Sequence, residues 1–383
     1  MKRLLLFILV IMGCCGRFAS DAKRCPATPA VVPPVEPLLV RSAVDDVRCR
    51  QWVDSVLGTL SLKERIGQLF IYTIAPYQDK GNKELLRKVV EDYKVGGLLF
   101  SGGLMQNQAM LTNEAQRMAD IPLLITFDGE WGLSMRLRGT PVFPKNMVLG
   151  CIQNDTLLYE YGREMARQCR ELGVQVNFAP VADVNINSKN PVINTRSFGE
   201  NPVNVANKVI AYARGLEDGG VLSVSKHFPG HGDTAGDTHD GYVALEKDWQ
   251  QLSECELIPF YNAINETDMI MAAHITLTRG NTDNLPCSLS YDALTLHLRC
   301  EMSYDGVIIT DALAMGAIVE NYSSKESAVL AFNAGADILL MPYDYAAAFN
   351  GILSAVQTGE ISLDRLNESV ERILRLKAEF GMI

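Results

Sequence analysis

Eight short apolar runs with strand character recur along the chain, and longer stretches with helical periodicity separate them. The runs lie near residues 70, 97, 124, 176, 224, 271, 308 and 339, and the helical stretches include 154–172, 202–218, 324–334 and 345–358. Strands that are apolar throughout are typical of a parallel sheet covered by helices on both faces. Eight such units in 383 residues predict an α/β fold, a (β/α)8 or TIM barrel, in a single domain. Because the first units look irregular, an open doubly wound sheet is the second possibility.

The N-terminus has the organisation of an export signal. Lys2 and Arg3 precede an apolar run, residues 4–12, which is too short to span a bilayer but suits the core of a signal peptide. The run leads into a Gly-Cys pair that resembles the site at which bacterial lipoproteins are cleaved and lipidated. Cys14 is the expected lipidated residue, and Cys15 is the alternative.

These features divide the chain into three parts. We expect a lipoprotein-type signal peptide over residues 1–14, a proline-rich tether over 15–47 and the catalytic domain over 48–383, which begins with a helix near Arg48. The protein would be exported, as a periplasmic or outer-membrane lipoprotein of a bacterium. It would touch the membrane only through its N-terminal lipid anchor.

Composition excludes several classes of partner and site. A formal net charge of −10 argues against nucleic acid or an anionic lipid surface as the main partner. Seven cysteines remain after Cys15, and none of them forms a CxxC pair, so a zinc ribbon or a thioredoxin-type site has no support. We expect a monomer that needs neither a metal nor a cofactor.

Polar side chains follow five of the eight predicted strands. In a barrel of this type the loops at the carboxyl ends of the strands build the active site. Asp128 follows the third strand, Asn177 the fourth, Lys226 with His227 the fifth, His274 the sixth and Asp311 the seventh. Polar groups that converge on one face from different strands indicate a site more strongly than any one of them alone.

The stretch KHFPGHGDTAGDTH, residues 226–239, contains three of the five histidines of the chain. A metal site is unfavoured because His227 and His231 would share a face only in a helix, and the glycines and the proline oppose one. A phosphate loop is unfavoured because the GxxxxGK[ST] spacing is absent. Acid–base chemistry fits better, because a carboxylate at Asp237 can orient the ring of His239.

Asp311 supplies the second group that such chemistry requires. It follows an apolar strand in GVIITDALAM, so its carboxylate should lie at the mouth of the barrel, although an N-cap of the next helix is the alternative. Glycoside hydrolysis uses a carboxylate on one side of the sugar and a proton donor on the other. Asp311 and His239 are residue types that can supply these two groups.

The motifs of this chain resemble those of glycoside hydrolase family 3, in its single-domain β-N-acetylhexosaminidase branch. The resemblance runs from about Val53 to the C-terminus. It is carried in the expected order by FDGEWGLSMRL, NTRSFGENP, KHFPGHGDT with DTH, and SYDGVIITDALAM. Two departures occur: Glu130 is followed by Trp131 and Gly132 where the family often has Gly-Gly, and Asp311 is followed by Ala312 where it often has a second Asp.

The resemblance implies a retaining exo-β-N-acetylglucosaminidase and a role for each matching residue. Asp311 would be the nucleophile that forms a covalent glycosyl-enzyme, and Asp237 with His239 the acid–base dyad. The implied substrate-binding residues are Asp128, Arg136, Arg196, Lys226 and His227. His231 would organise the loop, while His274 and Asn177 would line the pocket.

The substrate and the acceptor stay open. The implied substrates carry terminal β-linked N-acetylglucosamine, as peptidoglycan fragments, chitooligosaccharides or glycans do. A β-glucosidase or a β-N-acetylglucosaminide phosphorylase with the same fold is the enzymatic alternative, because a neutral histidine would not repel incoming phosphate. The alternative outside enzymes is a sugar-binding lipoprotein.

Overall fold

The eight apolar runs form eight parallel strands. The computed structural model describes residues 43–382. The strands are β1 (Phe70–Ile74), β2 (Gly97–Phe100), β4 (Leu124–Phe127), β6 (Val176–Asn177), β7 (Leu222–Phe228), β9 (Met269–Ala272), β11 (Val307–Thr310) and β12 (Leu339–Leu340). They pair in sequence order from β1 to β11, and β12 pairs with β1. A parallel bridge between Ile309 and Ile338 joins β11 to β12 and closes the ring. The predicted barrel is confirmed, and the open sheet is wrong.

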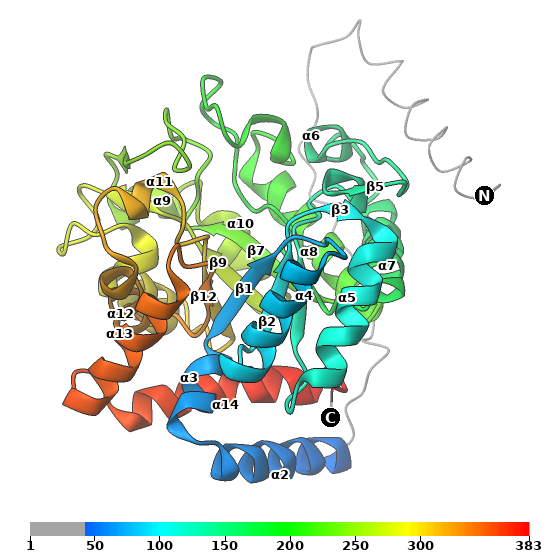
Figure 1. Cartoon of the computed structure of the whole chain (residues 1–383). Helices are drawn as coiled ribbons and strands as arrows, with labels where there is room; N and C mark the ends of the chain where they lie inside the picture. The colour runs from blue at the N-terminus through cyan, green and yellow to red at the C-terminus, as the bar shows by residue number, and fades with distance from the viewer. Residues whose placement is uncertain (1–42, 383) are drawn as a thin grey trace, which may run out of the picture.

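Helices surround the strands, as Figure 1 shows. They are α4 (Lys80–Arg87) with its π-helical extension η1 (Lys88–Asp92), α5 (Met105–Met118), α7 (Thr156–Glu171), α8 (Pro202–Asp218), α9 (Trp249–Ser253), α10 (Ile258–Ala263), the π-helix η5 (Asp292–Glu301), α12 (Ser324–Ala334) and α13 (Tyr345–Thr358). The four helical stretches predicted from periodicity agree with α7, α8, α12 and α13. In the first units α4 follows β1 and α5 follows β2, with two irregularities: α4 continues into the π-helix η1, and the short strand β3 (Gly103–Leu104) lies between β2 and α5.

Local signals in the sequence explain where helices begin. Ser61 and Glu64 form a capping box at the start of α3 (Leu62–Gln68). The side chain of Asn201 caps α8, whose first residue is Pro202. Helix α2 (Ala43–Thr59) starts earlier than expected and includes the last five residues assigned to the tether. The expected signal peptide and the tether up to residue 42 lie outside the described residues.

The two ends of the barrel differ in what covers them. Loops at the carboxyl ends of the strands carry the short helices η2 (Leu133–Met135), α6 (Asn146–Leu149), η3 (Asn194–Arg196), η4 (Cys287–Leu289) and α11 (Gly316–Val319), and two small parallel pairs, β3 (Gly103–Leu104) with β5 (Leu137–Arg138) and β8 (Val243–Leu245) with β10 (Ile275–Leu277). The other end is covered by α2, α3 and α14 (Leu363–Glu379), at the bottom of Figure 1. Within residues 43–382, no helix has both the length and the apolar character to cross a membrane.

Candidate active site

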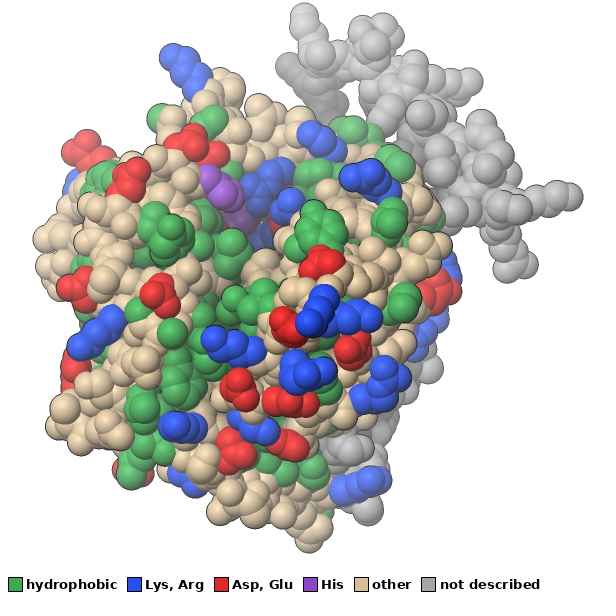
Figure 2. All heavy atoms as spheres, viewed as in Figure 1, with side chains coloured by type: hydrophobic (Ala, Val, Ile, Leu, Met, Phe, Trp, Pro, Cys, Tyr) green, Lys and Arg blue, Asp and Glu red, His purple; other side chains and the backbone are tan. Residues whose placement is uncertain are grey.

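The carboxyl ends of the strands bring predicted site residues to one face of the barrel. Figure 2 shows this face hollowed where histidine, lysine and arginine side chains gather. Lys226 and His227 are near the end of β7, Asp128 follows β4 and Asp311 follows β11. Because strand ends of a barrel share one rim, residues far apart in sequence face the same hollow.

Lys226 is the centre of a buried charge cluster. Its ammonium Nζ lies 2.7 Å from Asp128 Oδ1 and 2.8 Å from Glu130 Oε1, and its side chain is only 3% exposed. Arg196 pairs with Glu130 through two nitrogens, Nη2 at 2.6 Å from Oε1 and Nε at 3.0 Å from Oε2. Arg136 pairs with the second oxygen of Asp128. The cluster thus combines three cations with two carboxylates.

The ion pairs of the cluster keep Asp128, Glu130 and Lys226 charged. Burial alone would raise the pKa of Asp128, but the charges of Lys226 and Arg136 outweigh it and hold that pKa below its ordinary value. Burial would likewise raise the pKa of Glu130, but the charges of Lys226 and Arg196 lower it below its ordinary value. Burial would lower the pKa of Lys226, but its two carboxylate partners raise it. These fixed charges can donate to and accept from sugar hydroxyls without changing protonation state.

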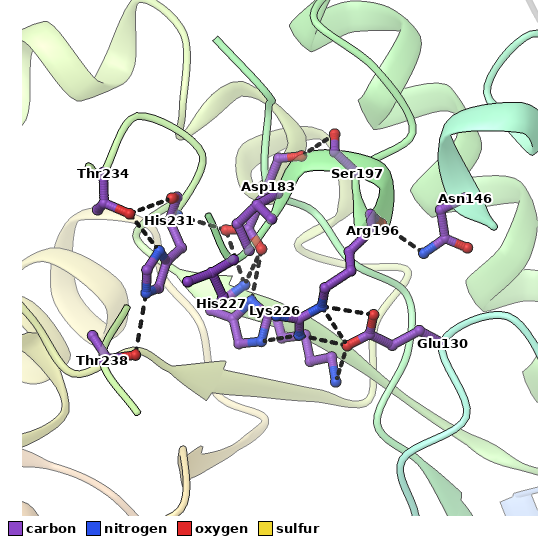
Figure 3. A network of polar contacts seen from close by, with 12 residues as sticks. Glu130, Asn146, Asp183, Arg196, Ser197, Lys226, His227, His231, Thr234 and Thr238 are labelled. Atoms are coloured by element: carbon purple, nitrogen blue, oxygen red, sulfur yellow. Dashed lines mark hydrogen bonds and ion pairs between the residues drawn. The ribbon is translucent and has the colours of Figure 1, made fainter. Parts of the chain in front are cut away.

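A second buried pair supports His227. Its Nδ1 lies 2.6 Å from Oδ2 of Asp183, a carboxylate with no solvent exposure, and its Nε2 lies 3.2 Å from Arg196 Nη2. Asp183 also accepts the backbone N–H of His231 at 2.6 Å. Burial would raise the pKa of Asp183, but the nearby His227 lowers it below its usual range. Figure 3 shows Asp183 between the two histidines, and Arg196 reaching from His227 to Glu130.

Adjacent residues of a regular strand point to opposite faces, yet Lys226 and His227 both contact site groups. The pairing of β7 with β9 shifts register between Lys226 and Phe228, which is a local irregularity of the bulge type. A bridge between Val181 and Lys226 also brings the segment that carries Asp183 alongside β7. The irregular strand end therefore aims two consecutive side chains at one site.

Glu130 and Asp183 are two residues of this site that were not predicted from the sequence. The sequence could have indicated Glu130 as a site residue, because it stands two residues after Asp128 in FDGEWG. The indication for Asp183 was weaker: it is a carboxylate just beyond the fourth strand, in APVADVN. The residue chosen there, Asn177, instead holds the backbone of Gly129, through contacts of 3.0 and 3.2 Å to its N–H and carbonyl.

Asp311 lies at the barrel mouth beyond β11. Its backbone N–H donates to the carbonyl of Ala272 at 2.9 Å, and its Oδ1 accepts the N–H of Ala312 at 2.8 Å. It is not an N-cap, because the residue at the N-cap of α11 is Met315. Burial alone would raise the pKa of Asp311, but the rings of His227 and His274 and the N–H of Ala312 hold it below its usual value. A carboxylate that stays ionised suits nucleophilic attack.

His274 supports the segment that carries Asp311. Its Nε2 lies 2.9 Å from the carbonyl of Ala312, and its Nδ1 lies 2.6 Å from the hydroxyl of Ser288. Burial lowers the pKa of this ring, so it stays neutral near pH 7. His274 therefore contacts the backbone next to Asp311 through a neutral ring.

Asp237 and His239 form a close pair on an exposed loop. His239 Nδ1 lies 2.8 Å from Asp237 Oδ1, and the same oxygen accepts the backbone N–H of His239 at 2.8 Å. The His239 side chain is 61% exposed, and its Nε2 is the nitrogen left to meet a substrate. Burial would raise the pKa of Asp237, but hydrogen bonds from His239 lower it, so an ionised carboxylate orients the ring.

The remaining histidine of the motif, His231, is buried between threonines. Its Nδ1 lies 2.8 Å from the hydroxyl of Thr234, and its Nε2 lies 3.2 Å from that of Thr238. Burial lowers its pKa to about 4, so the ring is neutral at pH 7. Among residues 43–382, no group of three or more histidine, cysteine or acidic side chains is arranged to hold a metal ion.

Comparison with known proteins identifies the architecture and its motifs. A sequence profile described as the glycosyl hydrolase family 3 N-terminal domain matches residues 61–376. The chain belongs to glycosyl hydrolase family 3. The family 3 match includes β1 to β12, and therefore every candidate site residue described above.

Curated family 3 relatives differ in how much of their length this chain spans. Beta-hexosaminidase A of Pseudoalteromonas piscicida is 34% identical over 328 residues, which is 77% of this chain and 55% of that protein. Beta-hexosaminidase LpqI of Mycobacterium tuberculosis is 31% identical over 367 residues, 92% of this chain and 89% of that protein. The chain therefore matches nearly all of one relative but little more than half of the other.

Solved structures show the same family 3 barrel. The family 3 β-N-acetylglucosaminidase of Paenibacillus sp. str. FPU-7 superimposes with a TM-score of 0.80 at 36% identity, over 85% of this chain and 63% of that one. Mycobacterium tuberculosis LpqI gives a TM-score of 0.75 at 29% identity, over 84% of this chain and 95% of that one.

Proposed function

We propose that the protein is a retaining exo-β-N-acetylglucosaminidase that removes terminal β-linked N-acetylglucosamine. The observation that carries the proposal is the arrangement of two different catalytic groups at one barrel mouth. Asp311 offers an ionised carboxylate, and the Asp237–His239 pair offers a proton donor on a loop that bonds to the helix after Asp311. The names of the relatives support the sugar, because they are hexosaminidases and an N-acetylglucosaminidase.

In the proposed reaction, the carboxylate of Asp311 attacks the anomeric carbon while the glycosidic bond breaks. The imidazolium of His239 gives its proton to the leaving oxygen, and the aglycone departs as an alcohol. The neutral ring then takes a proton from water, and the resulting hydroxide attacks the anomeric carbon and releases Asp311. Two displacements on one carbon retain its configuration.

A histidine acid has an electrostatic advantage in this site. After it gives up its proton the ring is neutral, so it adds no negative charge beside the ester formed on Asp311. Asp237 stays ionised and stabilises the protonated ring before transfer. The same neutral ring would admit phosphate as acceptor, so phosphorolysis is the outcome to be tested against hydrolysis.

Substrate recognition is assigned to the charge cluster. Asp128 can accept from sugar hydroxyls, and the cations Lys226, Arg136 and Arg196 can donate to hydroxyl and acetamide oxygens. Their mutual ion pairs fix each group before the sugar arrives, which lowers the cost of ordering them on binding. His227, fixed by Asp183, completes this set.

The export signal adds a proposal about location. The protein would be an exported lipoprotein, and this proposal rests on the sequence of the N-terminal residues, which lie outside the described residues 43–382. Incorporation of labelled palmitate that is lost in Cys14→Ser supports a lipoprotein anchored at that residue. If the palmitate label is lost only in Cys15→Ser, the lipid is attached to Cys15. If the parent protein takes up no label, it is not a lipoprotein.

Activity tests separate the candidate functions. Purified protein should release nitrophenol from 4-nitrophenyl N-acetyl-β-glucosaminide faster than from the β-glucoside, and phosphate should not accelerate release. Faster cleavage of the glucoside would indicate a β-glucosidase. A sugar phosphate product would indicate a phosphorylase, and binding without release would indicate a sugar-binding protein.

Replacing the nucleophile tests the mechanism. Asp311→Asn should lower kcat by roughly 10³-fold or more, because the amide cannot form the glycosyl-enzyme. Hydrolysis rates and the thermal midpoint are measured beside Asp54→Asn, an exposed aspartate on α2 that should leave both unchanged. Full turnover in Asp311→Asn would disprove the assigned nucleophile.

A further inference from the structure

The loop that carries His239 is bonded to the helix that follows Asp311. The carbonyl of Thr238 accepts the N–H of Ala317 at 3.0 Å, and the carbonyl of His239 accepts the N–H of Gly316 at 3.1 Å. Both donors are the first N–H groups of α11, which have no partner within their own helix. The loop therefore supplies the acceptors that the start of this helix needs.

Gly316 permits this contact because it has no side chain. A Cβ at this position would lie 2.6 Å from the carbonyl oxygen of His239 and 3.0 Å from backbone atoms of Asp240 and Gly241. Side-chain carbons essentially never approach other atoms within 3.0 Å, and these atoms are backbone, so they cannot rotate away. Any larger residue would move the His239 loop or the start of α11.

The same loop has a second anchor on its inner side. The hydroxyl of Thr238 lies 3.2 Å from Nε2 of His231, and the backbone N–H of His231 donates to Asp183. Thr238 is 1% exposed, whereas the next side chain along, His239, faces solvent. Thr238 thus joins the loop to the buried ring of His231 (Figure 3), while N–H groups of α11 donate to the backbone carbonyls of the loop.

We infer that Gly316 is a positioning residue, which lets the helix following the nucleophile hold the His239 loop in its working place. The inference rests on the proposed function, in which His239 is the acid–base group. It links the two catalytic groups mechanically, since Asp311 and the anchor of His239 belong to one short segment, residues 311–317. General acid–base efficiency depends on ångström-level placement of the proton donor.

The test is Gly316→Ala with two substrates that share the sugar. In N,N′-diacetylchitobiose the leaving alcohol must be protonated, whereas 2,4-dinitrophenolate leaves without a proton. We expect kcat/KM to fall roughly tenfold or more for the disaccharide and less than about threefold for the dinitrophenyl glycoside. Such a split reports the acid specifically, because general damage to the fold would lower both.

Three other variants make the result interpretable. Gly58→Ala is the matched control, since a Cβ there meets nothing within 4 Å, and it should leave both substrates unchanged. Thr238→Val, which removes the hydroxyl near His231 with little change of shape, should show the same split to a smaller degree. It keeps the test decisive if Gly316→Ala does not fold. His239→Asn measures the full split that loss of the acid itself produces.

The outcomes separate this inference from the proposed function. If His239→Asn shows the split but neither Gly316→Ala nor Thr238→Val does, the positioning role is wrong and the catalyst stands. Equal losses on both substrates in Gly316→Ala and Thr238→Val would also overturn the positioning role. If His239→Asn keeps full activity on the disaccharide, the proposed acid is wrong and the positioning role falls with it.

Discussion

Two buried lysines lie at opposite ends of the barrel and have opposite environments. Lys226, at the carboxyl end of β7, contacts the carboxylates of Asp128 and Glu130. Lys377, on α14 at the other end, has no carboxylate partner among the described residues: its Nζ meets the amide oxygen of Gln68 at 2.7 Å and the carbonyl of Gly96 at 3.0 Å. Both side chains are almost completely removed from solvent.

The difference in partners decides the charge of each lysine. Carboxylates raise the pKa of Lys226 against the effect of burial, so it stays charged. Burial without such partners lowers the pKa of Lys377 to about 7. The active-site end thus contains charges fixed by one another, whereas the opposite end contains a cation whose desolvation opposes folding. The comparison shows that a buried lysine of this protein keeps its charge where carboxylate partners offset the cost of burial.

The largest effect should follow from removing Lys226. Lys226→Met should lower kcat/KM by roughly 10²-fold or more, because the cluster loses its central donor. It should also lower the free energy of unfolding by about 3 kcal/mol, because Asp128 and Glu130 each lose a buried partner. Hydrolysis of the nitrophenyl N-acetylglucosaminide and urea denaturation at pH 7 measure the two effects.

Lys80→Met is the control for Lys226→Met. Lys80 is 90% exposed in a surface pair with Glu84, and such pairs contribute little. A Lys226→Met protein with normal activity would show that the cluster is structural rather than substrate-binding. A protein with normal stability would show that its carboxylates find other partners.

The barrel could be predicted from the sequence because each strand is a separate apolar run. A strand that is buried on both faces of a sheet consists almost entirely of apolar residues, and such a run is easy to recognise. The sequence also placed Lys226 at the site, since the residue ends such a run. The burial of Lys377 could not be predicted from the sequence, because nothing in the amphipathic helix 363–379 distinguishes this lysine from an exposed one. Whether a helical lysine faces solvent or the barrel floor depends on how the helix packs, and one lysine does not reveal it.

Contacts between loops that are far apart in the sequence could not be predicted either. Asp237 and His239 are two residues apart, so their pairing was predictable from spacing alone. The docking of that loop on Gly316 joins segments 77 positions apart and uses only backbone atoms. Backbone contacts leave a trace in the sequence only where glycine is required, and a single glycine in DALAMGAI has many explanations.

The lysine at the opposite end should make stability depend on pH. Because the folded pKa is about 7 and the unfolded value is near 10.4, the unfolded chain binds more protons between these limits, and stability rises with pH across them. The parent should gain about 2 kcal/mol from this group between pH 7 and pH 9. Lys377→Met should lack that gain, as seen by urea denaturation at both pH values.

A matched surface change isolates the effect of Lys377. Lys325→Met removes an exposed lysine from α12, so it should keep the parent's rise. The contribution of Lys377 is the difference between the two variants' profiles. A rise of equal size in Lys377→Met and Lys325→Met would mean that other groups cause it.

The smallest change should make the second lysine resemble the first. Gln68→Glu places a carboxylate where the amide oxygen now meets Lys377 Nζ, so the ammonium should stay charged through pH 9 and the rise should largely disappear. Stability at pH 7 should change by less than about 1 kcal/mol, because the ion pair replaces the Gln68 hydrogen bond to the carbonyl of Lys94. Gln250→Glu, on the exposed face of α9, is the control and should keep the rise. A Gln68→Glu protein that also kept the rise would show that the missing carboxylate is not what separates the two lysines.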